Sequence, residues 1–533
     1  MQVCESMKGK KKAKSGIAVS AALNIVRQAA MIAFPFITYS YATRTLGAKG
    51  IGVYEFAQSI VGYFSLIAAL GVANYAVRDG AKYREGANYG DGAKFRDGAK
   101  CGDGAKYKDG ADKKINASFV AETQNKAEKR PIDDFASQIF SINLIMTVVS
   151  YVLMFVLLYT NRHMYDYRIA IMISSISIFF TTLGADWINS LYEDYLYLTI
   201  RYIAVSIAAL IGLFVFVKGP EDLYIYIFIA IFSTIVNGIL NFFYVRKYVK
   251  IRFTLELNLK KHALPIFILF CNQIALVIYL NSDITILGFL TDDTSVGLYG
   301  VAAKIYTMIK TLLNAAIFVV IPRFSEYVLK KDERYTEGLK KLLSPLVTFL
   351  LPACVGLFFM AEDAVSIVGG DGYNEAALPL RILAIALFFA VMACYFANAI
   401  VMPFMLEKYF LLSTVCAAAL NIILNFLLIP NLGIAAAAIT TLIAEVLVFV
   451  MLVVVSAKKV ELSQLVNKRD LFGCVAGSVI IGVILAGYGM IFNGRLPQGI
   501  IGTIIRILVS VIVYGIILYV SGNSNIKNKK DIP

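Results

Sequence analysis

Fourteen long apolar stretches, separated by polar gaps, constrain this chain more than any other feature. A helix needs about 20 apolar residues to cross the hydrocarbon core of a bilayer, and the stretches are close to that length. Charged residues form 16% of the chain and hydrophobic residues 59%, which leaves too little charge to cover a surface that faces water. The sequence therefore predicts an all-α polytopic membrane protein with about fourteen transmembrane helices. The predicted spans are 17–41, 52–76, 138–160, 168–188, 196–217, 222–245, 264–289, 297–321, 343–361, 378–402, 409–430, 432–456, 471–492 and 498–520.

Lysine and arginine gather in alternate gaps. Five lie in 1–16, thirteen in 77–137, six in 246–261 and six in 322–342. The gaps on the other side hold Arg44, Lys49, Arg162, Arg168, Lys218, Arg381 and Arg495. Basic residues stay on the cytoplasmic side of membrane proteins, so both termini, including the tails 1–16 and 521–533, are predicted to be cytoplasmic. The net charge of +14 is spread over short loops and forms no basic domain, so no nucleic-acid partner is predicted.

Residues 78–113 are six tandem hexads, RDGAKY, REGANY, GDGAKF, RDGAKC, GDGAKY and KDGADK. They lack the aliphatic residue that a β-helix repeat points inward at each turn. We expect a flexible or weakly structured cytoplasmic insertion. The alternative is a docking segment for a cytoplasmic partner or for anionic lipid headgroups.

A second repeat relates the second span to the eighth. The segment Gly52–Ile60 resembles Gly297–Ile305 at an offset of 245 residues, and both copies run inward from outside. Parallel repeats are typical of transporters built from two halves with the substrate site between them. The sequence thus predicts an N-terminal six-helix lobe over 17–245, a C-terminal six-helix lobe over 264–456, and two extra helices over 471–520.

Polar side chains inside several spans require a structural or functional explanation, because placing an ionisable group at the bilayer centre costs roughly 3 kcal/mol of free energy or more. The candidates for a hydrated substrate cavity are Asn24, Arg27 and Gln28 in the first span, Asn272, Gln273 and Asp283 in the seventh, and Lys304 and Lys310 in the eighth. Glu55 and Glu445 are candidates for binding a coupling proton or cation.

Structural roles remain alternatives for several polar residues in and near the spans. Arg27 could form an ion pair with Glu55 or Asp283, and Asp186 lies near a predicted membrane boundary, where an interfacial role suffices. Asn421 and Asn425 are one helical turn apart, and intramembrane asparagines commonly bond neighbouring helices to one another.

Enzyme chemistry finds no support in the sequence. No HExxH, GxSxG or phosphate-cradling Gly-Lys-Ser/Thr motif occurs. We therefore expect neither enzymatic activity nor a cofactor nor a metal centre. The seven cysteines fall in spans or on the predicted cytoplasmic side, so disulfides are not expected.

Three segments resemble polysaccharide flippases. They are Thr43-Arg44-Thr-Leu46-Gly47 with the following Gly52-Val-Tyr54, Asn281-Ser-Asp283 continuing to Ile321-Pro322-Arg323, and Leu420-Asn421 continuing through Asn425, Pro430 and Thr440 to Glu445. Their order and spacing are similar to the O-antigen (Wzx-like) branch of the multidrug/oligosaccharidyl-lipid/polysaccharide (MOP) exporter superfamily. The resemblance covers nearly the whole chain apart from the hexads.

The resemblance implies a V-shaped pair of six-helix lobes that works by alternating access in the bacterial cell membrane. It implies transport of a polyprenyl-diphosphate-linked oligosaccharide from the inner to the outer leaflet, alongside other polysaccharide assembly proteins. A diphosphate in a low-dielectric region needs cations beside it, and Arg27, Lys304 and Lys310 could supply them. Two alternatives remain: an ion-coupled multidrug antiporter of the same superfamily, which would favour acidic cavity residues, and a membrane polysaccharide polymerase or ligase, which would need a large outer loop.

Overall fold

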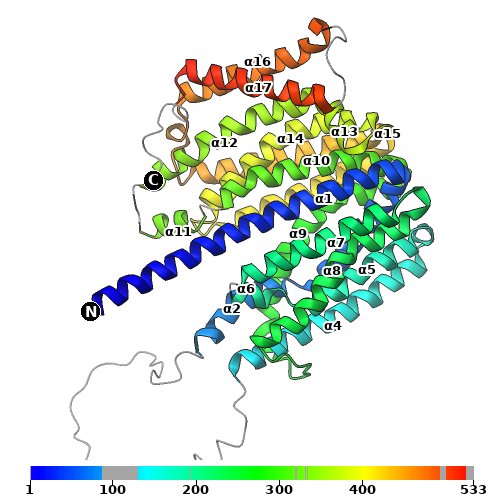
Figure 1. The fold of residues 1–533 in the computed structure, drawn as a ribbon, viewed down its shortest axis with the longest axis vertical. Helices are drawn as coiled ribbons and strands as arrows, with labels where there is room; N and C mark the ends of the chain where they lie inside the picture. Colours follow the sequence, from blue (N-terminus) through cyan, green and yellow to red (C-terminus); the bar gives the residue numbers. More distant parts are fainter. Residues whose placement is uncertain are drawn as a thin grey trace, which may run out of the picture.

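The structure, a computed structural model, describes residues 2–86, 130–192, 194–318, 321–330, 332, 334–492 and 500–523. Within these ranges, side chains are described except those of residues 2–29, 84–86, 195, 272, 316, 322–323, 488–492 and 500. Over the described residues the chain is helical and contains no strand (Figure 1). The predicted all-α polytopic fold is confirmed.

Most of the chain lies in long helices joined by short turns. The helices are α1 (Gln2–Ala69), α2 (Val72–Gly86), α4 (Pro131–Thr160), α5 (Arg168–Gly184), α6 (Trp187–Leu191), α7 (Tyr195–Phe216), α8 (Leu223–Tyr244), α9 (Leu259–Leu290), α10 (Asp293–Phe318), α11 (Ile321–Leu329), α12 (Arg334–Phe359), α13 (Ala361–Gly369), α14 (Ala377–Tyr395), α15 (Glu407–Ala457), α16 (Lys468–Phe492) and α17 (Ile500–Ser521). Among the described residues, twelve helices are long and apolar enough to cross a membrane.

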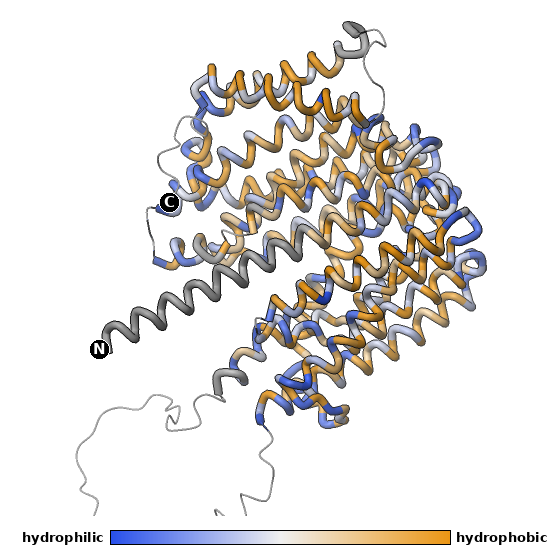
Figure 2. Tube along the Cα trace, viewed as in Figure 1, coloured by the Kyte–Doolittle hydropathy of each residue, from blue (hydrophilic) through white to orange (hydrophobic). Residues whose placement is uncertain are grey.

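Two of these helices are bent and account for two spans each. Gly47 in α1 has φ 70° and Gly433 in α15 has φ 53°, a left-handed conformation that glycine adopts at little cost. The 51 residues of α15 would extend about 77 Å as one straight helix, whereas the hydrocarbon core is roughly 30 Å thick. Counting both arms of each bent helix gives the fourteen predicted spans. Figure 2 shows apolar helix shafts with hydrophilic residues gathered at their two ends.

The two ends of the bundle differ in charge. We call the end that carries residues 246–258, with Arg246, Lys247, Lys250 and Arg252, the basic face. The opposite end, with the bend at Gly47 and the short helix α13, is the far face. Because successive spans alternate in direction, α5 ends and α7 begins at the basic face.

The two halves of the bundle touch closely at the far face, where α1 crosses α10. A Cβ atom on Gly52 would lie 1.7 Å from the carbonyl oxygen of Asp293, and one on Gly297 would lie 2.0 Å from the carbonyl oxygen of Ala48. Gly297 and Asp293 stand 245 residues after Gly52 and Ala48 respectively, the same offset as the sequence repeat. The repeated segments therefore meet each other as equivalent partners about a local two-fold axis.

Hydrogen bonds add to the contact between the two halves at the far face. Thr43 Oγ1 donates to the carbonyl oxygen of Val368 at 2.6 Å, and Arg44 Nη2 donates to that of Ile367 at 2.7 Å. Tyr373 Oη donates to the carbonyl oxygen of Thr43 at 3.2 Å. The bend of α1 is thus tied to α13 and the turn that follows it, and the halves are held together at the far face.

The last two helices lie against α12, outside the contact between the halves. Tyr514 Oη on α17 donates to the carbonyl oxygen of Thr348 at 2.7 Å. Arg506 on α17 forms an ion pair with Asp363 on α13 at 2.8 Å. In Figure 1, α16 and α17 form the outermost layer beside α12.

The hexad region begins as helix, which differs from the expected flexible insertion. Helix α2 continues to Gly86, so the first hexad and part of the second belong to it. The ring of Tyr83 stacks on that of Phe135 with centroids 4.6 Å apart, and Lys261 Nζ lies 4.8 Å from the Tyr83 ring centroid. Packing of the hexad tyrosine against α4 supports this extension, a contact that the hexad pattern does not reveal. Residues 87–129 lie outside the described residues.

The glycine crossing at the far face can be tested by cross-linking. In a background without the seven native cysteines, Thr43→Cys and Val368→Cys should form a disulfide readily, since Thr43 and Val368 are hydrogen-bonded. Adding Gly297→Val should reduce the cross-linked fraction severalfold, because its side chain cannot fit against the Ala48 carbonyl. Gly212→Val is the control, because nothing lies within 4 Å of a Cβ at that position. Equal cross-linking in both variants would contradict the crossing.

Candidate functional site

The predicted cavity residues fall into three groups. The side chains of Asn24, Arg27, Gln28 and Asn272 lie outside the described residues, and Gln273 is partly buried on α9. Lys304 and Glu55 meet where α1 and α10 adjoin. Asp283, Lys310 and Glu445 lie together on the other side of α10, among α9, α10 and α15.

Lys304 lies near the middle of α10 and faces aromatic side chains of α1. Its Nζ is 5.1 Å from the ring centroid of Tyr39, a cation–π distance. Among the described residues, no carboxylate oxygen comes within the 4.0 Å of an ion pair with Lys304. The buried Glu55 carboxylate and Tyr39 hydroxyl lie beside each other and interact, and Glu55 also interacts electrostatically with Lys304. A cation, a carboxylate and a phenol hydroxyl therefore gather where α1 and α10 adjoin.

Gly300 allows this cluster to approach α10. A Cβ there would lie 3.0 Å from Glu55 Cγ and 3.3 Å from Tyr39 Oη. Any larger residue would push Glu55 and Tyr39 away from the helix that carries Lys304.

A cavity of about 310 Å³ opens beside Lys304; we call it the Lys304 cavity. Apart from Lys304, its walls come from α1, α7 and α8. Its lining includes the aromatic residues Phe34, Tyr39, Tyr54, Tyr202 and Tyr226, and the hydroxyl residues Thr38, Ser206, Ser233 and Thr234. Such walls can hold a polar ligand by hydrogen bonds and its apolar faces by ring contacts.

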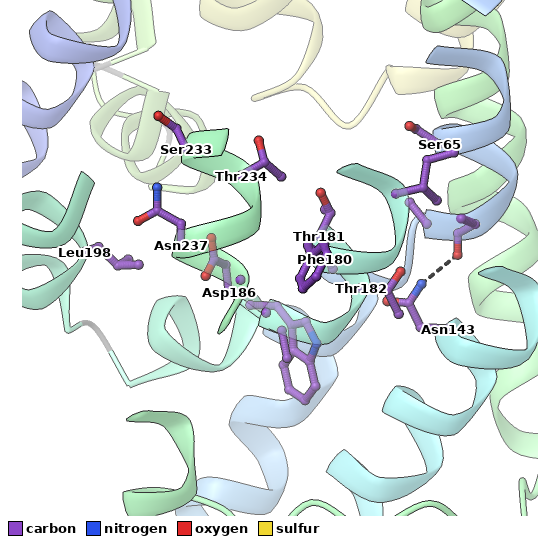
Figure 3. Close-up of a pocket in the computed structure, with 18 of the residues that line it drawn as sticks. Ser65, Asn143, Phe180, Thr181, Thr182, Asp186, Leu198, Ser233, Thr234 and Asn237 are labelled. Atoms are coloured by element: carbon purple, nitrogen blue, oxygen red, sulfur yellow. Dashed lines mark hydrogen bonds between the residues drawn. The ribbon is translucent and has the colours of Figure 1, made fainter. Parts of the chain in front are cut away.

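A second cavity of about 450 Å³, the Arg201 cavity, continues toward the basic face (Figure 3). Tyr202, Ser233 and Thr234 line both cavities. In Figure 3, Thr234 on α8 lies on the side of that helix nearer Thr181 and Phe180 on α5, whereas Ser233 and Asn237 point to its other side, where Leu198 lies. The two cavities therefore adjoin along α7 and α8, and together we call them the cavity path.

Arg201 and Asp186 mark the basic-face end of this path. Arg201 Nη2 donates to Asp186 Oδ1 at 3.0 Å, and the Arg201 side chain is only 5% exposed whereas that of Asp186 is 63% exposed. Arg201 Nε and Nη1 are buried and have no hydrogen-bond partner among the described residues, and the ring centroid of Tyr197 lies 5.2 Å from Arg201 Cζ. Sequence reasoning assigned Asp186 to the membrane boundary and gave Arg201 no role. The available signal was the position of Arg201, five residues inside a predicted span.

Asp283 occupies a different environment, enclosed by hydrogen-bond donors. Tyr299 Oη donates to its Oδ2 at 2.7 Å, and Thr441 Oγ1 donates to the same oxygen. Asn421 Nδ2 and Asn425 Nδ2 donate to Oδ1 at 3.0 and 2.6 Å. Four donors from α10 and both arms of α15 satisfy this buried carboxylate, and the two asparagines join helices as the sequence suggested.

Glu445 and Lys310 pair with each other beside this network. Lys310 Nζ lies 3.2 Å from Glu445 Oε1, and Tyr306 Oη donates to the same oxygen at 2.9 Å. The space left there is about 50 Å³. Lys310 therefore lies in a paired cluster of the second half, separate from the Lys304 cavity, although both lysines belong to α10.

Comparison with known proteins finds a matching family and two similar proteins. Residues 17–92 and 114–328 match the family described as "Polysaccharide biosynthesis protein". The gap in the match, 93–113, falls within the hexads. An O-antigen transporter of Escherichia coli (strain K12) is 24% identical over 78% of this chain and 90% of its own length. The low-salt glycan biosynthesis flippase Agl15 of Haloferax volcanii is 24% identical over 44% of this chain and 48% of its own length.

The fold also has a counterpart among solved structures. Lipid II flippase MurJ, in an inward closed conformation, aligns with a TM-score of 0.61 over 92% of this chain and 100% of its own. The sequences are 16% identical, so this likeness concerns the fold.

Replacing Asp283 should destabilise the second half of the bundle. Asp283→Asn places an amide nitrogen among groups that donate hydrogen bonds, and hydrogen bonds to a charged group contribute roughly 1.5–3 kcal/mol each. We expect a clearly lower melting temperature of the purified protein in detergent. Asp371→Asn, at an exposed position of the far face, should leave it unchanged. A wild-type melting temperature for Asp283→Asn would show that the network does not need the charge.

Proposed function

The chain belongs to the polysaccharide biosynthesis protein family, and we propose that it is a flippase that moves lipid-linked oligosaccharides across the bacterial cell membrane. The observation that carries the proposal is Lys304, a cation that has no ion-pair partner within 4.0 Å among the described residues and lies beside a cavity lined with hydroxyl and aromatic groups. The names of the two sequence relatives, an O-antigen transporter and a glycan biosynthesis flippase, support the same class of substrate.

The bias of lysine and arginine supports placing the basic face in the cytoplasm, with both termini on that side. The path that begins at Arg201 would then start at the cytoplasmic end of the bundle. The far face, held by α1, α10 and α13, would face outward and be closed. This arrangement suits loading of a substrate made in the cytoplasm.

The substrate class is a polyprenyl-diphosphate-linked oligosaccharide. The lipid tail can stay in the bilayer while the diphosphate and sugars use the cavity. A diphosphate away from water needs a compensating positive charge, since an unpaired buried ion costs several kcal/mol. Lys304 is placed to supply that charge, and Arg27, one of the cations predicted in the first span, is proposed to add to it.

Release on the outer side requires the far-face contacts to separate. The Gly52 and Gly297 crossing and the Thr43–Val368 hydrogen bond would open while the basic face closes. Glu55 is the better coupling candidate, because it is buried near Lys304 and forms no ion pair within 4.0 Å among the described residues, whereas Glu445 is already paired with Lys310. A proton or cation bound by Glu55 would change the charge next to Lys304 and so its hold on the diphosphate.

A multidrug antiporter would present free carboxylates to a cationic ligand. The carboxylates of the second half are instead bonded, Asp283 to four donors and Glu445 to Lys310. Glu55 lies near Lys304 but is not among the residues that line the Lys304 cavity, whose charged lining residue is Lys304, so the described cavities favour an anionic substrate.

Lys304→Gln should lower translocation of the lipid-linked glycan by roughly tenfold or more, since a lost charge-assisted contact is worth about 1.5–3 kcal/mol. Arg27→Ala should act in the same direction. The measurement is glycan transfer to the outer leaflet in proteoliposomes or in a deletion strain. Lys49→Gln, at an exposed far-face position, is the matched control. Wild-type rates in properly inserted Lys304→Gln and Arg27→Ala proteins would refute the cationic-cavity mechanism.

Deletion of 93–113, the part of the hexads outside the family match, should leave translocation within about twofold of wild type. This segment follows the packed part of α2, so its removal spares the Tyr83 contact with Phe135. The same transport assay measures it, with membrane insertion checked by protein level. A large loss of transport in a normally inserted protein would instead support the docking role.

A further inference from the structure

The most unusual buried group outside the Lys304 cluster is the Arg201 guanidinium. It lies within α7, about 9 Å from the start of that helix, at the end of the cavity path nearest the basic face. We infer that Arg201, with Asn237, Ser233 and Thr234, forms an oxyanion-binding subsite where the substrate is first bound before it reaches Lys304. This inference rests on the proposed function, because it assigns a step to the same substrate.

The bonding of Arg201 is incomplete. Nη2 donates to Asp186 and the Tyr197 ring centroid lies 5.2 Å from Cζ, while Nε and Nη1 have no hydrogen-bond partner among the described residues although 95% of the side chain is buried. Leaving a buried charged donor unsatisfied costs at least about 1–3 kcal/mol. The mostly exposed Asp186 carboxylate compensates only partly, since exposed ion pairs are weak. A bound ligand that accepts from Nε and Nη1 would recover this cost.

The geometry of the arginine side chain indicates the class of ligand that the subsite would bind. The planar guanidinium presents several N–H donors and binds phosphate or carboxylate groups through two hydrogen bonds at once. Asn237 Oδ1 is a second buried polar atom without a partner in the same cavity, and as an acceptor it suits a sugar hydroxyl. Ser233 and Thr234 add hydroxyl groups to this wall. The subsite therefore fits an oxyanion next to a sugar.

The subsite also lies in the cavity that adjoins the Lys304 cavity. From Asn237 to Tyr226, the wall that α8 gives to the two cavities runs for about 16 Å. One cation lies along each part of this path, Arg201 near the basic face and Lys304 deeper in the bundle. An anionic group that leaves Arg201 would meet a second cation, Lys304, further along this path.

The chain carries its own probe for this subsite. Trp187 is its only tryptophan, and it lines the Arg201 cavity next to Asp186. Its fluorescence in purified protein, in a detergent without phosphate groups, reports ligands that enter this cavity. The probes are farnesyl diphosphate against farnesol, and a soluble oligosaccharide bearing a uronic acid against its neutral counterpart.

We expect saturable changes in Trp187 emission with an anionic probe and none with its uncharged partner. Arg201→Gln should weaken the binding roughly tenfold or more, and Arg201→Lys should retain part of it. Asp186→Asn should strengthen it severalfold, because it removes the carboxylate that competes for the guanidinium. Arg168→Gln, an exposed arginine beside a tyrosine ring at the far face, is the control.

The two probe pairs identify the source of the oxyanion. A response to the diphosphate assigns the subsite to the lipid carrier, and a response to the uronic acid assigns it to the glycan; either supports the subsite. Unchanged binding in Arg201→Gln, or equal weakening by Arg201→Gln and Asp186→Asn, overturns it. If this titration fails while Lys304-dependent transport stands, only the subsite is wrong. If the wild type transports no lipid-linked glycan, the proposed function fails, while the titration still decides the subsite.

Discussion

Burying charge inside a bilayer-spanning bundle is expensive, and the interior of this protein is arranged around that cost. Three ways of accommodating buried charge occur among the described residues of the spans. Asp283 is surrounded by hydrogen-bond donors, Glu445 and Lys310 pair with each other, and Arg201 and Lys304 are incompletely paired. The first two arrangements hold helices together. In the proposed function, the third leaves positive charge for a ligand.

This division follows the two halves of the bundle. The second half closes its polar residues into a network around a space of about 50 Å³. The first half surrounds two connected cavities of about 310 and 450 Å³ with small, hydroxyl and aromatic side chains. The halves thus share a repeat in sequence but differ in use. In the second half, Asp283, Glu445 and Lys310 bond to neighbouring groups, whereas the first half surrounds the larger cavities, with Lys304 of α10 in their lining.

The contact between α1 and α10 at the far face and the Lys304 cavity involve the same two helices, so a separation of these helices would affect both. The crossing of α1 and α10 needs glycine at positions 52 and 297, because backbone carbonyl oxygens occupy the space of any side chain. Gly300 and Lys304 lie one and two helical turns further along α10 from that crossing. A separation of the two helices would move the cation relative to Tyr39 and Glu55. In the proposed mechanism, the closure of the bundle and the binding of an anion would therefore depend on the same pair of helices.

The sequence by itself determined the number of spans, their order and the bias of basic residues, because the bilayer imposes helix length and loop charge residue by residue. It also identified Lys304, Glu55 and Asp283 as polar residues inside spans that required a structural or functional explanation. The 245-residue repeat was also visible in the sequence, and in the fold its two glycines, Gly52 and Gly297, lie at the crossing of α1 and α10. Only the tertiary structure decided which charges satisfy one another. Lys310 and Lys304 are six residues apart on one helix, yet one faces Glu445 and the other the cavity. Arg201 gained importance only when α5, α7 and α8 enclosed it, since burial and missing partners arise from packing between helices far apart in the chain.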